Sequence, residues 1–256
     1  MKQTVKTGAL VVYGSRWSET SKIVHLFTEE KGYIKAIAHG ALRPKSPYRG
    51  VLENLNQVEV ILSLKEGRGL QIVTQVDLID SFGNIRENLD AMAVSYAILE
   101  LIRSLVHFHE AAHRLFPFTV NILKNLNRQP DKHTLIYLFS YLLFLSDYLG
   151  FGWDLATCKV CGKSLEKFPL RADVENGSVI CAGCSPATGK GNFTLSREQW
   201  LLLRRLKETG PEELPDLAWE MSPDVMYQPL LDMLLAHINY HTEQTVQLKS
   251  LKMYLP

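Results

Sequence analysis

The sequence predicts an α+β protein with more than one domain: a small β-barrel, followed by an α-helical domain that carries an inserted four-cysteine module. Three observations predict this architecture. Apolar and polar residues alternate in short runs over the first 80 residues, whereas from residue 84 apolar residues recur with the period of a helix. The four cysteines of the chain stand as two close pairs between residues 158 and 184. We therefore expect domains at residues 1–80, at residues 81–156 with 190–256, and, for the cysteine module, at residues 157–189.

Five segments of the first domain have the composition and length of β-strands. Gly14 and Gly32 mark turns between the first three, and a Lys-Glu-Gly-Arg-Gly segment joins the last two as a hairpin. The longest connection separates the third strand from the fourth. This order predicts a Greek-key barrel of the OB type, which binds nucleic-acid strands on one open face and with its loops; an SH3-like barrel without that function fits the same pattern. The expected strands cover residues 8–13, 23–28, 33–38, 57–64 and 70–77.

The third of these strands and the connection after it are basic. Residues 31–50 contain five Lys or Arg and no Asp or Glu, although the whole chain has a formal net charge of +1. Residues 1–80 hold 11 basic against 8 acidic residues, and the remainder holds 17 against 19. Cations that neutralise phosphate, next to rings on which bases stack, are what a single nucleic-acid strand requires; a strand edge kept soluble by its charges is the alternative. The candidate nucleic-acid-binding residues of this stretch are Lys31, Tyr33, Lys35, Arg43, Lys45 and Arg49.

Helices are expected from residue 84 onward. Asn84 and Glu87 fit a capping pair at the start of the first one, and further helices are expected over residues 118–126 and 132–149. The aromatic residues of the last segment are read as core, since they recur at helical spacing. That stripe consists of Tyr137, Phe139, Tyr141, Phe144 and Tyr148.

Two more helices are expected after the cysteine module. Ser196 and Gln199 fit a capping box that starts one of them. Ser222 followed by Pro223 is typical of the start of the other, because Pro is favoured at the first helical position. We expect these helices to pack with those of residues 84–150 in a single helical domain.

The sequence gives no prediction of export or membrane insertion. The first residues soon turn polar and lack the apolar stretch of a secretory signal. The most apolar run, residues 135–145, is shorter than the roughly 20 residues that a bilayer requires. We therefore expect a cytoplasmic protein, in which the apolar run is a buried helix.

The cysteines form the most specific motif of the chain. Cys158 and Cys161 are followed, after 19 residues, by Cys181 and Cys184, a spacing typical of a structural zinc site with four thiolate ligands. A Glu-Asn-Gly segment ending at Gly177 predicts a hairpin that brings the second pair back to the first. Two disulfides or a redox pair are the alternatives, which the absence of a secretory signal disfavours. We expect one structural Zn²⁺, whose closed set of ligands leaves no position for a reacting water.

A second motif predicts a different chemistry. His109, Glu110 and His113 match H-E-x-x-H, in which two imidazoles on one helix face bind zinc and the Glu is a general base. Such a site needs a third protein ligand, but no further His follows at the expected spacing and no Glu occurs between Glu110 and Glu166. A polar helix end is the other interpretation. A zinc metallopeptidase therefore stays an alternative function.

Several stretches along the whole chain resemble the bacterial recombination mediator family RecO. The most specific are Gly32-Tyr-Ile-Lys35, the segment Gly40-Ala-Leu-Arg-Pro-Lys-Ser46 and the frame of four cysteines. The resemblance implies a protein of the RecF pathway of DNA repair and recombination that binds single- and double-stranded DNA and anneals complementary strands without bond chemistry. It implies the partner RecR, contact with the C-terminal tail of the single-strand binding protein SSB, and loading of RecA onto SSB-coated DNA.

Carried onto this chain, the resemblance places DNA binding on the five basic residues of positions 31–49, with Tyr33 as a stacking surface. It adds Arg68 in the hairpin turn, and Trp17, as secondary candidates. It assigns no residues to the SSB tail or to RecR, and it implies a nucleoid-associated location. Some relatives lack the full set of cysteines, which implies a structural role for the zinc. A nucleic-acid-binding scaffold of another pathway, such as a transcription or RNA factor, is a further alternative.

Overall fold

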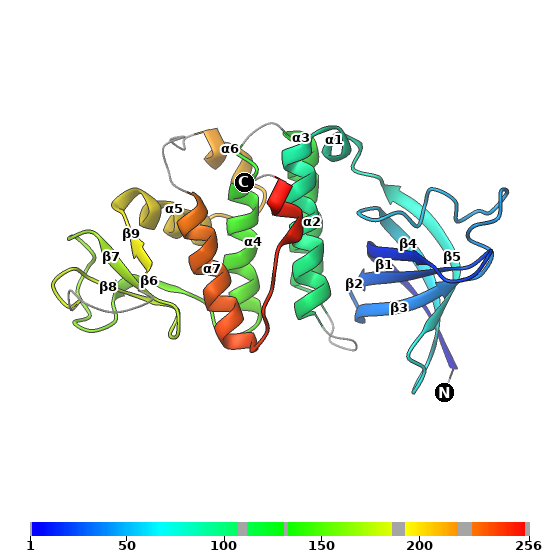
Figure 1. The fold of residues 1–256 in the computed structure, drawn as a ribbon, viewed down its shortest axis with the longest axis horizontal. Helices are drawn as coiled ribbons and strands as arrows, with labels where there is room; N and C mark the ends of the chain where they lie inside the picture. Colours follow the sequence, from blue (N-terminus) through cyan, green and yellow to red (C-terminus); the bar gives the residue numbers. More distant parts are fainter. Residues whose placement is uncertain (1, 107–111, 131–132, 186–192, 220–226, 254–256) are drawn as a thin grey trace. The chain divides into compact units, whose positions relative to one another are not determined.

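The structure is a computed structural model of residues 1–256, and it describes all of them except residues 1, 107–111, 131–132, 186–192, 220–226 and 254–256 (Figure 1). The chain divides into two compact units. Unit 1 comprises residues 1–130 and 248–254, and unit 2 comprises residues 131–247 with 255–256. The predicted α+β architecture, with a barrel, a helical part and a four-cysteine module among strands, is confirmed. The finer division into three domains stays a prediction.

The first five strands close into a barrel in the order β1-β2-β3-β5-β4. Neighbouring strands are antiparallel except β3 and β5, which pair in parallel through Ala36 with Gln71 and Ile37 with Ile72. This closure, in which the third strand meets the fifth, is the Greek-key arrangement expected of an OB-type barrel. The strands are β1 (Lys2–Arg16), β2 (Lys22–Thr28), β3 (Gly32–Ala38), β4 (Gln57–Lys65) and β5 (Gln71–Asp80).

Strand β1 is much longer than the sequence predicts. Its residues Lys2 to Leu10 pair with β4, and its residues Ala9 to Arg16 pair with β2, with an irregularity between Val11 and Tyr13. One strand therefore closes the barrel on both sides. The expected strand covered only residues 8–13, because the polar residues before it hide the alternation.

The barrel core explains which side chains point outward. Along β3, Ile34, Ala36 and Ala38 are fully buried, and Lys35 between them is exposed. Successive side chains of a strand alternate between its faces, so the inward register of the apolar residues forces Lys35 onto the outer face. Burying each large aliphatic side chain of this core contributes about 1.5–3 kcal/mol, which makes a shift of one residue costly.

Unit 1 also contains α1 (Gly83–Glu87), α2 (Leu89–Leu105), α3 (Leu115–Arg128) and the 3₁₀ helix η1 (Lys249–Met253). The predicted capping pair of Asn84 and Glu87 is wrong. Asn88 caps α2, and its side chain accepts a hydrogen bond from the backbone N–H of Ala91 at 2.9 Å. The Asn84 side chain instead donates to the Asn127 carbonyl at 2.8 Å. A long-range contact thus uses the polar group that the local pattern assigned to a cap.

Unit 2 contains a small sheet in the order β6-β8-β7-β9. The predicted capping box at Ser196 and Gln199 is present at the start of α5, and the predicted hairpin before Gly177 joins β7 to β8. Ser222 and Pro223 lie outside the described residues. The elements are α4 (Leu135–Tyr148), β6 (Asp154–Cys158), β7 (Leu170–Asp173), β8 (Ser178–Ile180), β9 (Phe193–Leu195), α5 (Arg197–Glu208), α6 (Leu214–Trp219) and α7 (Tyr227–Thr242).

The aromatic stripe of α4 is core, as expected. Tyr137, Phe139 and Tyr141 are fully buried, and Phe144 and Tyr148 are half-buried. Among the described residues, no helix combines the length and the apolar character that a membrane span needs.

Candidate nucleic-acid interface and metal centre

The connection between β3 and β4, residues 39–56, is fixed to the barrel at several points. The Leu42 N–H donates to the Thr20 carbonyl at 2.9 Å, and the Tyr48 hydroxyl donates to the Thr74 carbonyl of β5 at 3.0 Å. Leu52 and Leu55 are buried. These hydrogen bonds and buried side chains fix the backbone of the connection. The connection therefore holds its polar side chains in defined positions.

A turn at Gly40 starts this connection. Gly40 has a φ of 73°, a left-handed conformation that favours glycine. Its carbonyl accepts a hydrogen bond from the Arg43 N–H at 3.1 Å, and the Arg43 carbonyl accepts one from the Ser46 N–H at 3.0 Å. The Arg43 side chain lies against Gly40, within 3.6 Å of the position a Cβ would take. The Gly-Ala-Leu-Arg-Pro-Lys-Ser segment is therefore a compact pair of turns with outward cations.

Four exposed side chains of this region form what we call the loop surface: Trp17, Arg43, Lys45 and Arg49. Trp17 is 63% exposed and lies in the β1–β2 turn, which the Leu42–Thr20 hydrogen bond joins to the connection. Within the described part of the chain, none of the three cations forms an ion pair with a carboxylate. The loop surface thus offers positive charge that no described carboxylate pairs with, and an open aromatic ring in the turn that is bonded to the connection.

The remaining predicted cations lie elsewhere on unit 1. Lys31 is half-buried in the turn before β3, whereas the connection follows the other end of that strand. Lys35, on the outer face of β3, lines a pocket together with Arg68 of the β4–β5 turn. The structure therefore divides the predicted set among a loop, a turn and a pocket.

Arg103 is a pocket residue that the sequence analysis missed. It is exposed in the last turn of α2, and its guanidinium carbon lies 4.7 Å from the ring centre of Tyr13 in β1. Its local sequence does not indicate a binding residue, because Arg103 lies near the end of a largely apolar helix and is 35 positions from Arg68. Only the packing of α2 on the barrel brings it to Lys35.

Tyr33 is placed differently from the open ring that stacking on a base requires. It is 8% exposed, and its hydroxyl lies 2.6 Å from Nδ1 of His25. Burial raises the pKa of Tyr33 to about 12, so its phenol stays protonated. Burial also lowers the pKa of His25, and the nearby charges of Lys35 and Arg103 lower it further. Among the aromatic candidates for base stacking, Trp17 has its ring open to solvent.

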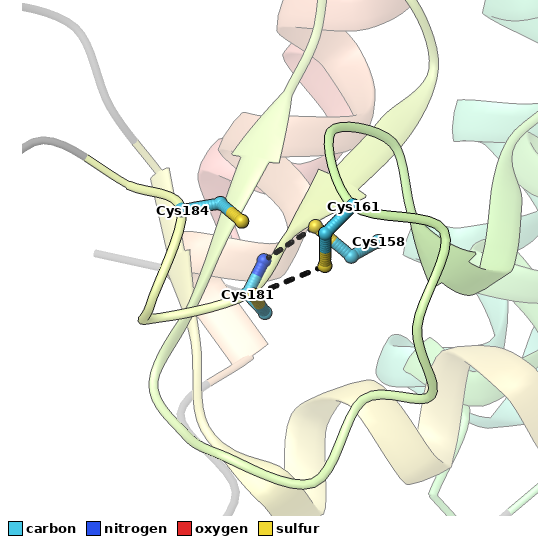
Figure 2. Close-up of side chains that lie close together, drawn as sticks. All are labelled: Cys158, Cys161, Cys181 and Cys184. Carbon is cyan, nitrogen blue, oxygen red and sulfur yellow. Dashed lines mark hydrogen bonds between the residues drawn. The ribbon is translucent and has the colours of Figure 1, made fainter.

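The four cysteines converge on one point of unit 2. Figure 2 shows their side chains pointing toward one another, Cys158 and Cys161 from the turn at the end of β6, Cys181 and Cys184 from the turn after β8. All four sulfurs lie within 4.8 Å of one another, and the sulfurs of Cys161 and Cys181 are 3.9 Å apart. Tetrahedral zinc with Zn–S distances near 2.3 Å places its sulfurs about 3.8 Å apart. The cluster therefore has the size and the donor set of a metal site.

The chain around the cluster favours thiolate at one ligand. Burial opposes ionisation of Cys158, but backbone N–H groups, first that of Cys181 at 3.3 Å and then those of Cys161 and Val160, outweigh it and lower the pKa of Cys158 to about 6. Hydrogen bonds among the thiols, first with Cys161 and then with Cys181, raise the pKa of Cys184 to about 12. All four cysteines are free of disulfides. A metal cation bound among these sulfurs would stabilise their thiolate forms.

The structure describes only part of the H-E-x-x-H motif. His109 and Glu110 lie outside the described residues, and His113 is exposed just before α3. Among the described residues, the cysteine cluster is the one group of three or more His, Cys, Asp or Glu side chains arranged to hold a metal ion.

Comparison with known proteins gives consistent matches along the chain. The family profile described as "Recombination protein O N terminal" matches residues 1–82, and the profile "Recombination protein O C terminal" matches residues 86–252. The protein named DNA repair protein RecO in Rhodopirellula baltica is 30% identical over 224 residues, 86% of this chain and 81% of its own. That of Syntrophomonas wolfei is 29% identical over 204 residues, 79% and 78% of the two chains. That of Caldanaerobacter subterraneus is 27% identical over 98% of both. The chain therefore belongs to the recombination protein O (RecO) family.

Proposed function

We propose that this protein is a DNA-binding recombination mediator of DNA repair, which binds single- and double-stranded DNA through its barrel and anneals complementary strands. Family membership supports the pathway, and the loop surface supports the activity. The observation that carries the proposal is the set of three exposed cations on the β3–β4 connection, none of them paired with a described carboxylate, with the exposed Trp17 in the turn that is hydrogen-bonded to that connection. Cations that contact phosphates and a ring that stacks on a base are the two elements of single-strand binding.

The mechanism is binding. Arg43, Lys45 and Arg49 neutralise phosphates and release condensed counterions, which lowers the repulsion between two strands. Contacts to the backbone leave the base edges free, so a bound strand can still pair with its complement. Lys31, Lys35 and Arg68 extend the positive surface along and beside β3. Tyr33 is buried on the outer face of the barrel, where it supports the neighbouring side chains, and it is not required to stack on a base.

The proposed partners follow from the family. With RecR, this protein helps to load RecA onto single-stranded DNA coated with SSB, and it contacts the C-terminal tail of SSB. The test is an annealing assay in which two complementary strands, each coated with SSB, are mixed with the protein. Acceleration of pairing supports the proposal. Binding of DNA without annealing, or annealing of bare strands alone, contradicts the mediator activity and favours a nucleic-acid-binding scaffold of another pathway.

The cysteine cluster holds one structural Zn²⁺ in this proposal. The sulfurs of Cys158, Cys161, Cys181 and Cys184 are the ligands, and the distances between them suit tetrahedral coordination. Bound zinc joins the turn at the end of β6 to the turn after β8, and four protein ligands leave no open position on it. Metal analysis of protein purified without chelator is the test, with one zinc per chain as the expected result.

A further inference from the structure

The pocket beside β3 is built from parts of unit 1 that are distant in the sequence. It has a volume of about 430 Å³. Lys35 comes from the outer face of β3, Arg68 from the β4–β5 turn and Arg103 from the last turn of α2. The polar groups of Tyr33, Gln71 and Ser104 complete the lining together with Gly69 and Val106. Three cations from three elements therefore meet in one concave site.

Two of the three cations are held in position by contacts that make no use of carboxylates. Gln71 is buried, and its side-chain amide donates to the Arg68 carbonyl at 2.7 Å while its oxygen accepts from the Lys65 N–H at 2.8 Å. These bonds fix the turn that carries Arg68. Arg103 lies over the ring of Tyr13, which orients its guanidinium without neutralising it. The arrangement exists before any ligand binds.

Among the described residues, no carboxylate balances the charge of the pocket lining, since no Asp or Glu lines it. Burial lowers the pKa of the neighbouring His25, and the charges of Lys35 and Arg103 lower it further. Like charges that converge without a counter-charge repel one another, and an anion in the pocket removes that repulsion.

We infer that this pocket binds a phosphate monoester, the group that a DNA strand carries at a phosphorylated end. The inference rests on the proposed function for the source of the ligand, but the chemistry comes from the pocket itself. A phosphate monoester carries a charge of about −1.5 to −2 near pH 7 and offers three strong acceptor oxygens. A phosphodiester inside a strand carries one charge and is served by the open loop surface. Three convergent cations, two of them with forked guanidinium groups, match the terminal group better.

The experiment compares single-stranded oligonucleotides of one sequence that differ only at their ends. One has hydroxyl groups at both ends, one has a 5′-phosphate and one has a 3′-phosphate, with the fluorophore on an internal base. We expect the wild type to bind one phosphorylated form about tenfold more tightly than the hydroxyl form, since charge-assisted hydrogen bonds have that magnitude. Equal affinity for all three, together with no binding of a free nucleoside monophosphate, would overturn the inference and leave the proposed function intact. Failure to bind any of them would contradict the proposed function itself.

Variants test whether the preference arises in the pocket. Arg103→Ala is expected to abolish the difference between the oligonucleotides, and Arg103→Lys, which keeps the charge but loses the fork, to reduce it. Arg128→Ala is the matched control, because Arg128 is likewise exposed in the last turn of a unit 1 helix but does not line the pocket. A preference that survives Arg103→Ala, with the fold confirmed by circular dichroism, would overturn the inference.

A free phosphorylated compound is the other source of the same chemistry. The ring resonances of His25 report on the pocket, so a nucleoside 5′-monophosphate and the matching nucleoside are titrated separately without DNA. A shift with the monophosphate alone, lost in Arg103→Ala, supports the monoester site. If the monophosphate binds but strand ends give no preference, the ligand is a free compound. Absence of both effects would overturn the inference.

Discussion

The Tyr33 hydroxyl lies 2.6 Å from Nδ1 of His25, and the two rings meet edge to face with their centres 5.6 Å apart. This pair joins β3 to β2 across the outer face of the barrel. A tyrosine in a basic segment can have one of two roles: it can support a positive surface, or it can stack on a base. Exposure decides between them, and Trp17 at 63% is the ring available to a base.

Trp17→Ala should change the affinity for DNA, whereas Tyr33→Phe should change the stability of the fold. Removing Trp17 removes one stacking partner, worth about 1–3 kcal/mol per base, so single-strand affinity should fall about tenfold while thermal stability is unchanged. Removing the Tyr33 hydroxyl leaves His25 without a partner and should lower the free energy of unfolding by about 1 kcal/mol, with little change in affinity. Fluorescence anisotropy and denaturant unfolding measure the two quantities. The same response in both variants would contradict this division of roles.

Charge removal on the loop surface should change the salt dependence of binding. Each of Arg43→Ala, Lys45→Ala and Arg49→Ala is expected to reduce the slope of log affinity against log salt concentration by roughly one unit, about equally for all sequences. Titrations with the same oligonucleotide at several salt concentrations measure the slope.

Lys6→Ala is the matched control for these variants. Lys6 is an exposed cation of the same barrel, but it is already paired with Glu59 at 2.7 Å. Its removal should leave the slope nearly unchanged. If a folded variant with all three loop cations replaced kept the wild-type slope, the loop surface would not be the DNA-binding surface.

His25 should titrate below the usual pKa of about 6.5. Burial lowers its pKa first, and the charges of Lys35 and Arg103 add to the effect. Lys35→Ala should therefore raise the pKa of His25, whereas Lys45→Ala, on the loop, should not change it. Ring proton resonances followed by NMR against pH give both values. An unchanged pKa in Lys35→Ala would show that the charge of Lys35 does not reach the imidazole.

The same shift has a consequence for stability. Below pH 6.5 the unfolded chain takes up a proton at His25 before the folded chain does. The unfolded state then binds more protons, so the free energy of unfolding decreases as the pH falls from 6.5 toward the lower pKa of the folded state. Denaturant unfolding between pH 7.5 and pH 5 should detect a smaller decrease in His25→Gln than in the wild type.

Removal of the metal should destabilise the cysteine module. Cys161→Ser removes one of four ligands at an exposed position, so we expect zinc content well below one per chain and a lower Tm. Val160→Ala alters the neighbouring exposed residue and should keep the metal. Elemental analysis and calorimetry with and without chelator measure both effects. Wild-type protein that contains much less than one zinc per chain would refute the structural zinc.

Local patterns in the sequence predicted those features that depend on local chemistry. The alternation at residues 33–38 predicted the strand, and the capping box at Ser196 predicted the start of α5. The spacing of the cysteines gave a cluster whose sulfurs converge. In each case, the residues that decide the structure are close in sequence or share a fixed geometry.

Features that depend on packing between distant segments could not be predicted in this way. The first half of β1 is polar and becomes a strand because β4 pairs with it. Asn84 fits a cap but bonds to α3, and Arg103 joins the pocket only because α2 packs on the barrel. Tyr33 looked like a stacking residue because the sequence does not reveal what covers the outer face of β3.

The return of the chain to unit 1 has a consequence for its synthesis. Helix η1 packs on α2, where the Ser250 hydroxyl donates to the Glu100 carboxylate at 3.3 Å, and residues 131–247 form the other unit in between. While a ribosome is translating those intervening residues, η1 has not yet been synthesised, so the face of α2 that it packs on is uncovered. Unit 1 can therefore complete its packing only after residues 248–253 have left the exit tunnel.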